Sequence, residues 1–222
     1  VPPDKPKEEL KRADFGLPES KNLYCCPQTL FKIHPKFDLA LSKIIEKDPD
    51  AQIIMIETKF KSHMEKLKNR WAKNFATLEK KVIFLKSMPL EKFLSLIEVS
   101  NVLLDPFYFG GGLSFTETLG IGTPTVTMPT TFMRSQVTAG LYKQMKIKDP
   151  PIANNVDEYV ELAIEFAKNA KKNSDFKKSL RSAAELHLFN NLKSVKQFEQ
   201  FLQESHEAAL KDSYLKDGYV VR

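Results

Sequence analysis

Three consecutive glycines at positions 110–112 stand where a strand-like apolar run, ending at Asp105, gives way to a short helix-like segment. Glycine lets a backbone approach a ligand closely, and the first N–H groups of a helix have no partner inside it, so such a turn is a natural seat for phosphate. An acid one turn into the helix, here Glu117, can reach a ribose hydroxyl. This spacing predicts a nucleotide-sugar site whose diphosphate lies on the N–H groups near Leu113 and Ser114.

The same residues also fit a structural role. Ser114 and Glu117 have the Ser-x-x-Glu spacing of a capping box, in which the serine caps the helix and the glutamate reaches back. A capping box does not require three consecutive glycines, which cost conformational entropy if nothing uses them. We therefore favour the phosphate seat and keep the capping box as the alternative.

Lys32 lies in a second loop, after the apolar stretch at 21–26. As a point charge beside the diphosphate, it would stabilise the leaving group when the sugar departs. Taken alone, this loop fits an ordinary surface lysine better, because the chain has many. Nearby, His34 precedes a proline and fits a loop residue or a helix start.

A third loop follows another apolar run and covers residues 85–93. We expect backbone groups near Ser87 and Met88 to read a base edge. Phe93 either stacks on that base or packs as a core residue of the next helix, and the spacing leaves both readings open. In a fourth loop, Arg134 faces either an anion or solvent.

The elements that must position these loops alternate between strands and helices. Strands are expected at 21–26, 51–57, 81–85, 101–105, 125–128 and 152–153. Helices are expected at 37–47, 63–76, 89–99, 114–119, 135–145, 156–170, 176–188 and 195–210. This alternation predicts an α/β fold, a Rossmann-like parallel sheet with helices on both faces, whose ligands lie at the carboxyl ends of the strands.

The chain is expected to hold one nucleotide-sugar-binding domain at 21–210. Residues 1–20 are polar and proline-rich and are predicted to be a linker or tail, and 211–222 a C-terminal tail. Because the sequence does not begin with Met, we expect it to be a piece of a longer protein.

The composition argues against membrane, metal and nucleic-acid binding. No run approaches 18 apolar residues, so no membrane span is expected. The net charge is +6, but most lysines stand near Glu or Asp on predicted helices, which indicates a solvated surface and no nucleic-acid partner. Adjacent Cys25 and Cys26 fit reduced thiols, and the start lacks a signal region, so we expect a cytoplasmic location. The chain has no Walker motif, and its Asp48-Pro-Asp50 ends the helix expected at 37–47, so no Asp-x-Asp pair suggests a metal-held diphosphate. We therefore expect a metal-independent site without a cofactor.

Four pieces of the chain carry a family likeness: the loop from Gln28 to Pro35, the stretch 84–89, the turn from Leu104, and the segment 122–129. In order and spacing, over roughly residues 14–205, the chain resembles the C-terminal half of the O-linked N-acetylglucosamine transferases and SPINDLY-like glycosyltransferases. The resemblance implies a GT-B fold, in which two Rossmann-like domains face each other across a cleft, with this chain as the donor-binding domain. It also implies inverting, metal-independent transfer from a UDP-sugar, expected to be UDP-N-acetylglucosamine, to a protein or other acceptor such as a glycan.

The resemblance further implies residue roles. Lys32 matches the catalytic contact to the diphosphate, Glu117 the ribose-binding acid, and Met88 with Phe93 the uracil neighbourhood. The expected donor-binding residues are Gln28, Thr29, Met88, Phe93, Gly110, Gly111, Gly112, Leu113, Ser114 and Glu117. The acceptor-side domain, its tetratricopeptide repeats and the general base would lie outside this chain, which alone is expected to bind donor but turn over little or nothing.

Three other functions remain open. A non-catalytic module that senses a nucleotide sugar is compatible, because no general base is identifiable. A UDP-sugar epimerase of the same fold would need cleft acids and a histidine, of which this chain offers few. A basic nucleic-acid binder would show steep salt dependence of binding.

Overall fold

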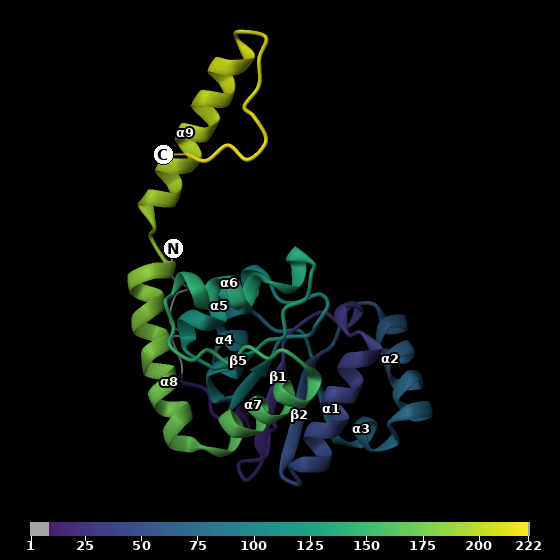
Figure 1. Ribbon diagram of the computed structural model, residues 1–222. Coiled ribbons are helices and arrows are strands. Elements are labelled where there is room, and N and C mark those ends of the chain that lie inside the picture. The colour runs from purple at the N-terminus through teal and green to yellow at the C-terminus, as the bar shows by residue number, and fades with distance from the viewer. Residues whose placement is uncertain (1–8, 222) are drawn as a thin grey trace. The chain divides into compact units, whose positions relative to one another are not determined.

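The computed structural model describes residues 9–221, and its centre is a five-stranded sheet in which every neighbouring pair is parallel (Figure 1). The strand order is β3-β2-β1-β4-β5, so β2 and β3 are added on one side of β1 and β4 and β5 on the other. The switch point of the sheet therefore lies between β1 and β4. In such sheets ligands bind at this switch point, outside the carboxyl ends of the strands. The strands are β1 (Asn22–Cys26), β2 (Ala51–Ile56), β3 (Val82–Leu85), β4 (Val102–Leu104) and β5 (Thr125–Val126).

Helices cover both faces of the sheet, with α1, α3 and α7 on one face and α4 and α5 on the other. The α-helices are α1 (Pro35–Lys47), α2 (Lys61–Asn74), α3 (Ala76–Lys81), α4 (Leu90–Val99), α5 (Leu113–Ile121), α6 (Val137–Gln144), α7 (Val156–Lys168), α8 (Ala170–Ala183) and α9 (Leu192–Ala209). Shorter turns are the 3-10 helices η1 (Arg12–Phe15), η2 (Leu30–Lys32) and η3 (Met133–Ser135), and the π-helical η4 (Ala184–Leu188). The predicted fold class is confirmed.

The predicted elements differ most from the structure in three places. The helix expected at 63–76 is two helices, broken at Phe75. The strand expected at 125–128 is only two residues long, after which Thr127 and Ile152 form an isolated parallel bridge. The helix expected from 176 begins at Ala170, because the side chain of Asn169 accepts a hydrogen bond from the N–H of Lys172 and caps it.

Alternate residues of a strand pack into two separate hydrophobic cores, one on each face of the sheet. Tyr24 and Cys26 lie in the cluster under α1 and α7, whereas Leu23 and Cys25 lie in the cluster under α4 and α5. This explains the unbroken apolar strand sequences, since both faces of the sheet are covered. It also places the adjacent cysteines on opposite faces, where both are buried free thiols, as predicted. Burial raises the pKa of Cys25 to about 12.

The segment predicted as a linker at 1–20 is part of the domain where it is described, from residue 9 onward; residues 1–8 lie outside the described range. Phe15 and Leu17 are buried in the cluster under α4 and α5. Between them, Gly16 has a φ of 66°, a left-handed conformation that turns the chain after η1. The linker prediction is therefore wrong for 9–20, because two apolar residues in a polar segment suffice to dock it.

The predicted domain end at residue 210 is also displaced. The compact unit ends at Leu188, and residues 189–221 form a second unit made of α9 and the segment that follows it. No residue of α9 is buried, although its apolar residues recur at helical spacing. The same periodicity characterises a packed helix, so sequence alone could not separate the two cases. No helix within residues 9–221 has the length and apolar character needed to cross a membrane.

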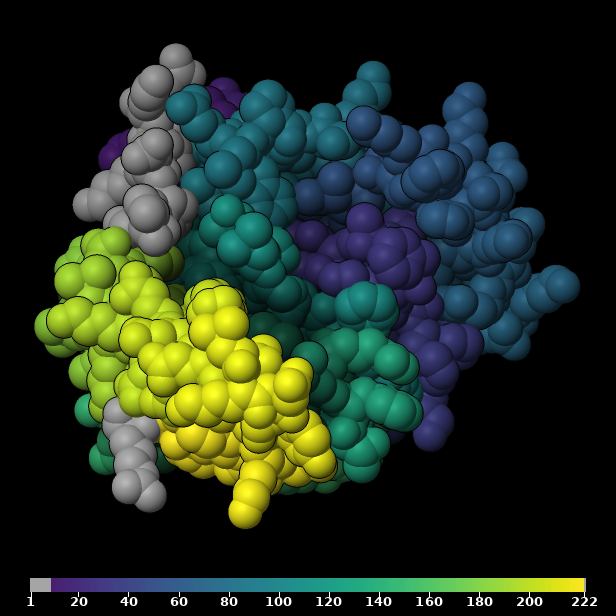
Figure 2. Space-filling view, turned by 90° about the horizontal axis from the view of Figure 1, so that it is seen from above, coloured from purple at the N-terminus to yellow at the C-terminus, as the bar shows by residue number. Residues whose placement is uncertain are grey.

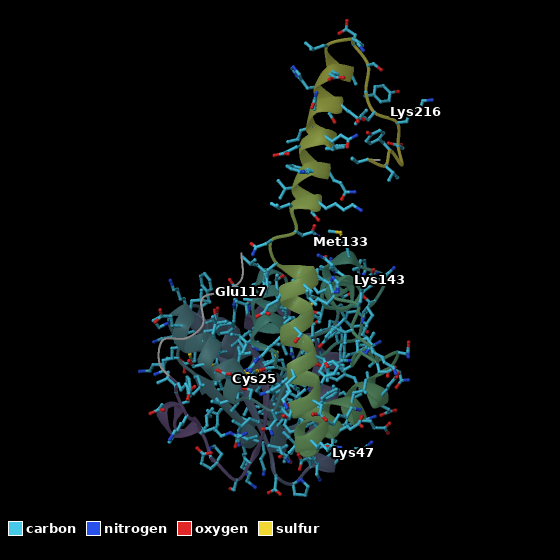
Figure 3. All side chains as sticks on the ribbon, turned by 90° about the vertical axis from the view of Figure 1, so that its left-hand side faces the viewer. Cys25, Lys47, Glu117, Met133, Lys143 and Lys216 are labelled. Atoms are coloured by element: carbon cyan, nitrogen blue, oxygen red, sulfur yellow. The ribbon has the colours of Figure 1, made fainter. Side chains whose placement is uncertain are left out.

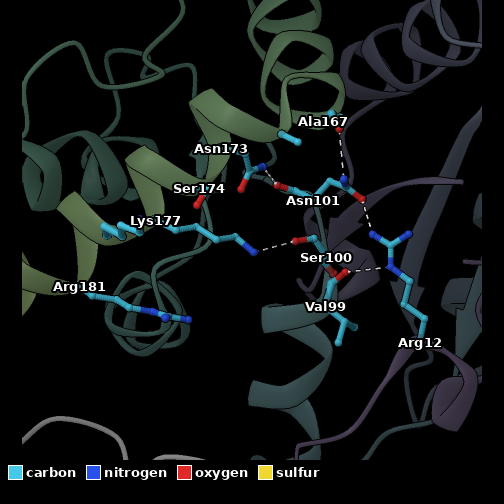
Figure 4. A pocket seen from close by; sticks show the side chains of 11 residues that line it. Arg12, Val99, Ser100, Asn101, Ala167, Asn173, Ser174, Lys177 and Arg181 are labelled. Atoms are coloured by element: carbon cyan, nitrogen blue, oxygen red, sulfur yellow. Dashed lines mark hydrogen bonds between the residues drawn. The ribbon is translucent and has the colours of Figure 1, made fainter. Parts of the chain in front are cut away.

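A basic pocket of about 350 Å³ lies beside the carboxyl end of α4 (Figure 4). Lys177 Nζ donates to the carbonyl oxygens of Glu98 and Ser100, at 3.0 and 3.4 Å, and Arg181 Nε donates to the carbonyl oxygen of Ile121 at 2.7 Å. Cations at helix carboxyl ends satisfy carbonyl groups that have no partner within the helix. Burial, together with the charge of Arg181, lowers the pKa of Lys177 to about 8. These side chains therefore fasten α8 to the ends of α4 and α5.

Candidate functional site

The loops after β1 and β4 meet at the carboxyl edge of the sheet through a chain of side-chain hydrogen bonds. Gln28 Nε2 donates to Ser114 Oγ at 3.0 Å, and Lys32 Nζ donates to Gln28 Oε1 at 2.8 Å. Lys32 Nζ also donates to the carbonyl oxygen of Gly110 at 3.0 Å. Figure 2 looks onto this edge, where the purple segment around residue 30 lies beside the teal segments around 110 and 130. The structure thus brings together four of the predicted site residues.

Lys32 is not an ordinary surface lysine. Lys32 is half-buried, and its ammonium group lies 4.6 Å from the centre of the Phe109 ring and uses two of its three protons on Gln28 and Gly110. Burial lowers the pKa of Lys32, while the nearby charge of Asp105 raises it. The third N–H of the ammonium group remains for a ligand, and the hydrogen bonds to Gln28 and Gly110 fix its direction.

Two close contacts that the sequence did not reveal explain why glycines stand in the turn at 110–112. A Cβ on Gly110 would lie 2.7 Å from a carboxylate oxygen of Asp105, and a Cβ on Gly111 would lie 2.4 Å from the ring of Phe115. Both glycines are therefore required by packing. A Cβ on Gly112 would meet nothing within 4 Å, so only this glycine borders open space. The glycine count is weaker evidence for a phosphate seat than we inferred from the sequence.

Helix α5 begins at Leu113 with Gly112 as its N-cap, and no side chain caps it. The alternative capping box on Ser114 is therefore not formed: Ser114 lies in the first turn, and its hydroxyl accepts the Gln28 amide. Leu113 is 77% exposed. The first N–H groups of α5 have no partner within the helix, which is the arrangement expected of an anion seat.

Glu117 lies one turn into α5 and is half-buried. Among residues 9–221 its carboxylate makes no hydrogen bond or ion pair, so it is available to a ligand. In Figure 3, Glu117 and Met133 lie toward one end of the domain, whereas Lys47, the last residue of α1, lies toward the other.

The remaining predicted residues are less closely connected to this network. Met88 and Phe93 are half-buried and pack against the cluster under α4 and α5, so a core-packing role accounts for Phe93. Thr29 is exposed and precedes η2 without capping it through its side chain. His34 is the N-cap of α1, where its Nδ1 accepts the N–H of Lys36, so its helix-start reading is confirmed.

Asp105 organises the turn, although sequence reasoning had assigned it only to the end of a strand. Its carboxylate is buried, with Oδ1 accepting the N–H of Gly111 and Oδ2 accepting the hydroxyl of Thr127, both at 2.8 Å. Burial raises the pKa of Asp105 to about 6, against the lowering effect of these hydrogen bonds. The sequence signal for this role of Asp105 is its position, directly after a buried strand and before the glycines.

Asp105→Asn is expected to remove a pH dependence of stability. The pKa of Asp105 is about 6 in the folded chain and about 4 when unfolded, so the folded state binds more protons between these values and wild type loses stability as pH rises from 4 to 6. The asparagine amide can keep both hydrogen bonds by accepting from Gly111 and donating to Thr127. From pH 4 to 7, the variant should therefore gain about 2–3 kcal/mol over wild type in urea unfolding. A difference that stays constant with pH would contradict this.

Within residues 9–221, no group of three or more His, Cys, Asp and Glu side chains is arranged to hold a metal ion. The polar groups gathered at the edge are instead an ammonium, an amide, a hydroxyl and free helix N–H groups. All of these can donate to an anion.

The fold and the edge site define a class of protein. The chain matches a mutant O-GlcNAc transferase from Thermobaculum terrenum with a TM-score of 0.74 and 20% identity, covering 93% of this chain and 38% of that one. It matches HepE from Anabaena, solved with UDP and glucose, with a TM-score of 0.63 and 13% identity, covering 87% and 51%. The chain therefore has the Rossmann-like fold of a GT-B domain.

Sequence comparison narrows the class to a family. The chain belongs to glycosyl transferase family 41, whose family model matches residues 7–200. It is 26% identical over 196 residues to a probable UDP-N-acetylglucosamine–peptide N-acetylglucosaminyltransferase, SEC, of Arabidopsis thaliana. That alignment covers 88% of this chain but 20% of the plant protein, so the chain spans about a fifth of its length. The resemblance to the O-linked N-acetylglucosamine transferases is confirmed.

Proposed function

We propose that this chain is the donor-binding domain of an inverting, metal-independent glycosyltransferase that moves N-acetylglucosamine from UDP to a protein or other acceptor. The observation that carries the proposal is the network linking Lys32, Gln28 and Ser114 at the open start of α5. The names of the relatives support it, since the Arabidopsis protein is a probable UDP-N-acetylglucosamine–peptide transferase and the Anabaena structure holds UDP and glucose.

The proposed reaction is a direct displacement at the anomeric carbon of the sugar. The acceptor oxygen or nitrogen forms a bond to that carbon from one side. On the other side, the bond to the β-phosphate oxygen breaks, and its electron pair leaves with UDP. Lys32 and the first N–H groups of α5 stabilise the charge that grows on the departing phosphate, and they are fixed before the reaction begins.

The proposal assigns the remaining tasks to parts outside this chain. The acceptor proton goes to a general base in a second GT-B domain, which precedes this one and completes the cleft. Tetratricopeptide repeats, where present, belong to the same preceding part of the protein. The 222-residue chain alone therefore binds donor and turns over little or none. A cytoplasmic location, favoured by two reduced cysteines, belongs to the same proposal.

Glu117→Gln tests the ribose contact. The carboxylate accepts hydrogen bonds from ribose hydroxyls, so its loss should weaken UDP binding about tenfold, equivalent to about 1.4 kcal/mol. The 2′,3′-dideoxy analogue of UDP lacks both hydroxyls and should bind wild type and variant equally in calorimetric titration. Glu57→Gln is the matched control, a half-buried glutamate directly after β2 at the same edge. An equal loss for both ligands would remove Glu117 from the ribose site, and no UDP binding to wild type at millimolar concentration would remove the proposed function.

Product analysis separates transfer from epimerisation. A protein containing this chain is incubated with UDP-N-acetylglucosamine and no acceptor. We expect the donor to be recovered with its sugar configuration unchanged, whereas an epimerase would convert it.

A further inference from the structure

The positive charge of the chain is concentrated in one segment that the proposed donor site does not use. Residues 57–86, from the end of β2 to the loop after β3, contain nine Lys and Arg against three Glu. Their net charge of +6 equals that of the whole chain, so the remainder of the sequence is neutral as a whole. The excess charge belongs to α2, α3 and their loops, and in Figure 1 α2 lies on the opposite side of the domain from α8.

One face of α2 is fixed to the domain, and the opposite face is free. Leu67 and Trp71 are buried, and Arg70 Nε donates to the buried carboxylate of Asp38 in α1 at 2.6 Å. The opposite face carries exposed polar residues at three- and four-residue spacing, namely Ser62, Lys66, Asn69 and Lys73. Together with the exposed Lys59 and Phe60 just before the helix, these residues form what we call the α2 surface.

The lysines of the α2 surface lack acidic partners. The ammonium groups of Lys59, Lys66 and Lys73 make no hydrogen bond or ion pair with any residue in the range 9–221. Elsewhere in the domain, Lys21 and Lys43 pair with Asp side chains. Neighbouring cations without partners repel one another, and a ligand with several negative charges in a row relieves that repulsion.

A row of aromatic contacts joins the α2 surface to the candidate site. The ring of Phe60 is centred 5.3 Å from the ring of His63, which is centred 6.3 Å from the ring of Phe31. Phe31 immediately precedes Lys32 in η2, and Lys32 belongs to the hydrogen-bond network at the start of α5. A polymer bound at the reaction edge therefore reaches the lysines of α2 along a continuous surface.

We infer that the α2 surface docks an acidic segment of a polypeptide acceptor, beside the residue that receives the sugar. The inference rests on the proposed function, in which the acceptor is a protein, and adds the charge of the acceptor sequence. Helix α2 has 14 residues and is about 21 Å long, a length that an extended peptide covers with about six residues. Phe60, which is 66% exposed, offers an apolar contact where the segment leaves the reaction edge.

Tethered ligands test the inference on the 222-residue chain. The β-phosphate of UDP is joined through about twelve glycine and serine residues to hexaglutamate or to hexaglutamine, and calorimetry gives the Kd of each ligand. Because tethering makes the second contact intramolecular, the hexaglutamate ligand should bind wild type about tenfold more tightly than the hexaglutamine ligand at low salt. The triple variant Lys59→Gln, Lys66→Gln and Lys73→Gln should bind both tethered ligands equally, with the Kd of UDP unchanged.

The matched control also removes three exposed lysines that lack partners within residues 9–221, through Lys143→Gln, Lys148→Gln and Lys171→Gln. It should keep the tenfold preference, and an equal loss in both triple variants would overturn the inference because only total charge would matter.

Two further outcomes would contradict an acidic acceptor segment. Free hexaglutamate that binds through the α2 lysines, without any gain from the tether, would separate this surface from the donor site. A twelve-nucleotide polyuridylate that binds the same lysines more tightly than hexaglutamate would instead indicate a nucleic-acid surface. If UDP binds and the tethered ligands do not differ, the inference alone fails; if wild type binds no UDP at all, the proposed function fails.

Discussion

Lys32→Met is expected to weaken UDP binding about 10- to 100-fold, because a hydrogen bond from a charged donor contributes about 1.5–3 kcal/mol. Methionine retains the length of the side chain but not its charge. Uridine, which has no phosphate, should bind wild type and variant equally. Calorimetric titration with both ligands therefore isolates the diphosphate contact from any general change in the site.

The matched control for this variant is Lys86→Met, an exposed lysine in the loop after β3 at the same edge. It should leave the affinities for UDP and uridine unchanged. Lys32→Met also leaves Gln28 Oε1 and the Gly110 carbonyl without their donor, so its unfolding must be measured beside its binding. A folded variant that binds UDP as tightly as wild type would eliminate Lys32 from the donor site. Equal losses for UDP and uridine would indicate a displaced loop.

Gly111→Ala is expected to reduce the free energy of unfolding by about 3 kcal/mol, as forced overpacking of a core does. The new methyl group would lie 2.4 Å from the ring of Phe115, which is fully buried and has no room to retreat. Relief by backbone movement would shift the turn away from Asp105 and from the start of α5. We therefore expect UDP affinity to fall with stability, measured by urea unfolding and calorimetry on the same sample.

Gly140→Ala provides the matched control for the glycine prediction. Gly140 lies inside α6, where a Cβ would meet nothing within 4 Å. Alanine is the better helix former, so this substitution should stabilise the chain by about 0.5–1 kcal/mol and leave UDP affinity unchanged. If Gly111→Ala were as stable as wild type, the packing explanation for that glycine would be wrong.

Part of the candidate site could be predicted from the sequence, and specific residues show where prediction stopped. The loop positions of Lys32 and Ser114 followed from apolar strands that had to end at a common edge. The spacing of Ser114 and Glu117 also suggested a capping box, but the turn at Gly112 starts the helix one residue before Ser114. Phe93 was ambiguous because stacking on a base and packing in a core both need an aromatic residue at the same helical position.

The alternation of strands and helices followed from the sequence alone, because side-chain periodicity and turn residues act between near neighbours. Parallel strands then placed all the predicted loops at one edge. The folded chain was needed to show that Lys32 contacts Gly110, 78 positions away, that Asp105 holds the turn, and that two of the three glycines serve packing. Such contacts depend on how the helices pack on the sheet, which no local pattern encodes. For the same reason, the amphipathic sequence of α9 could not reveal that this helix lies outside the compact unit.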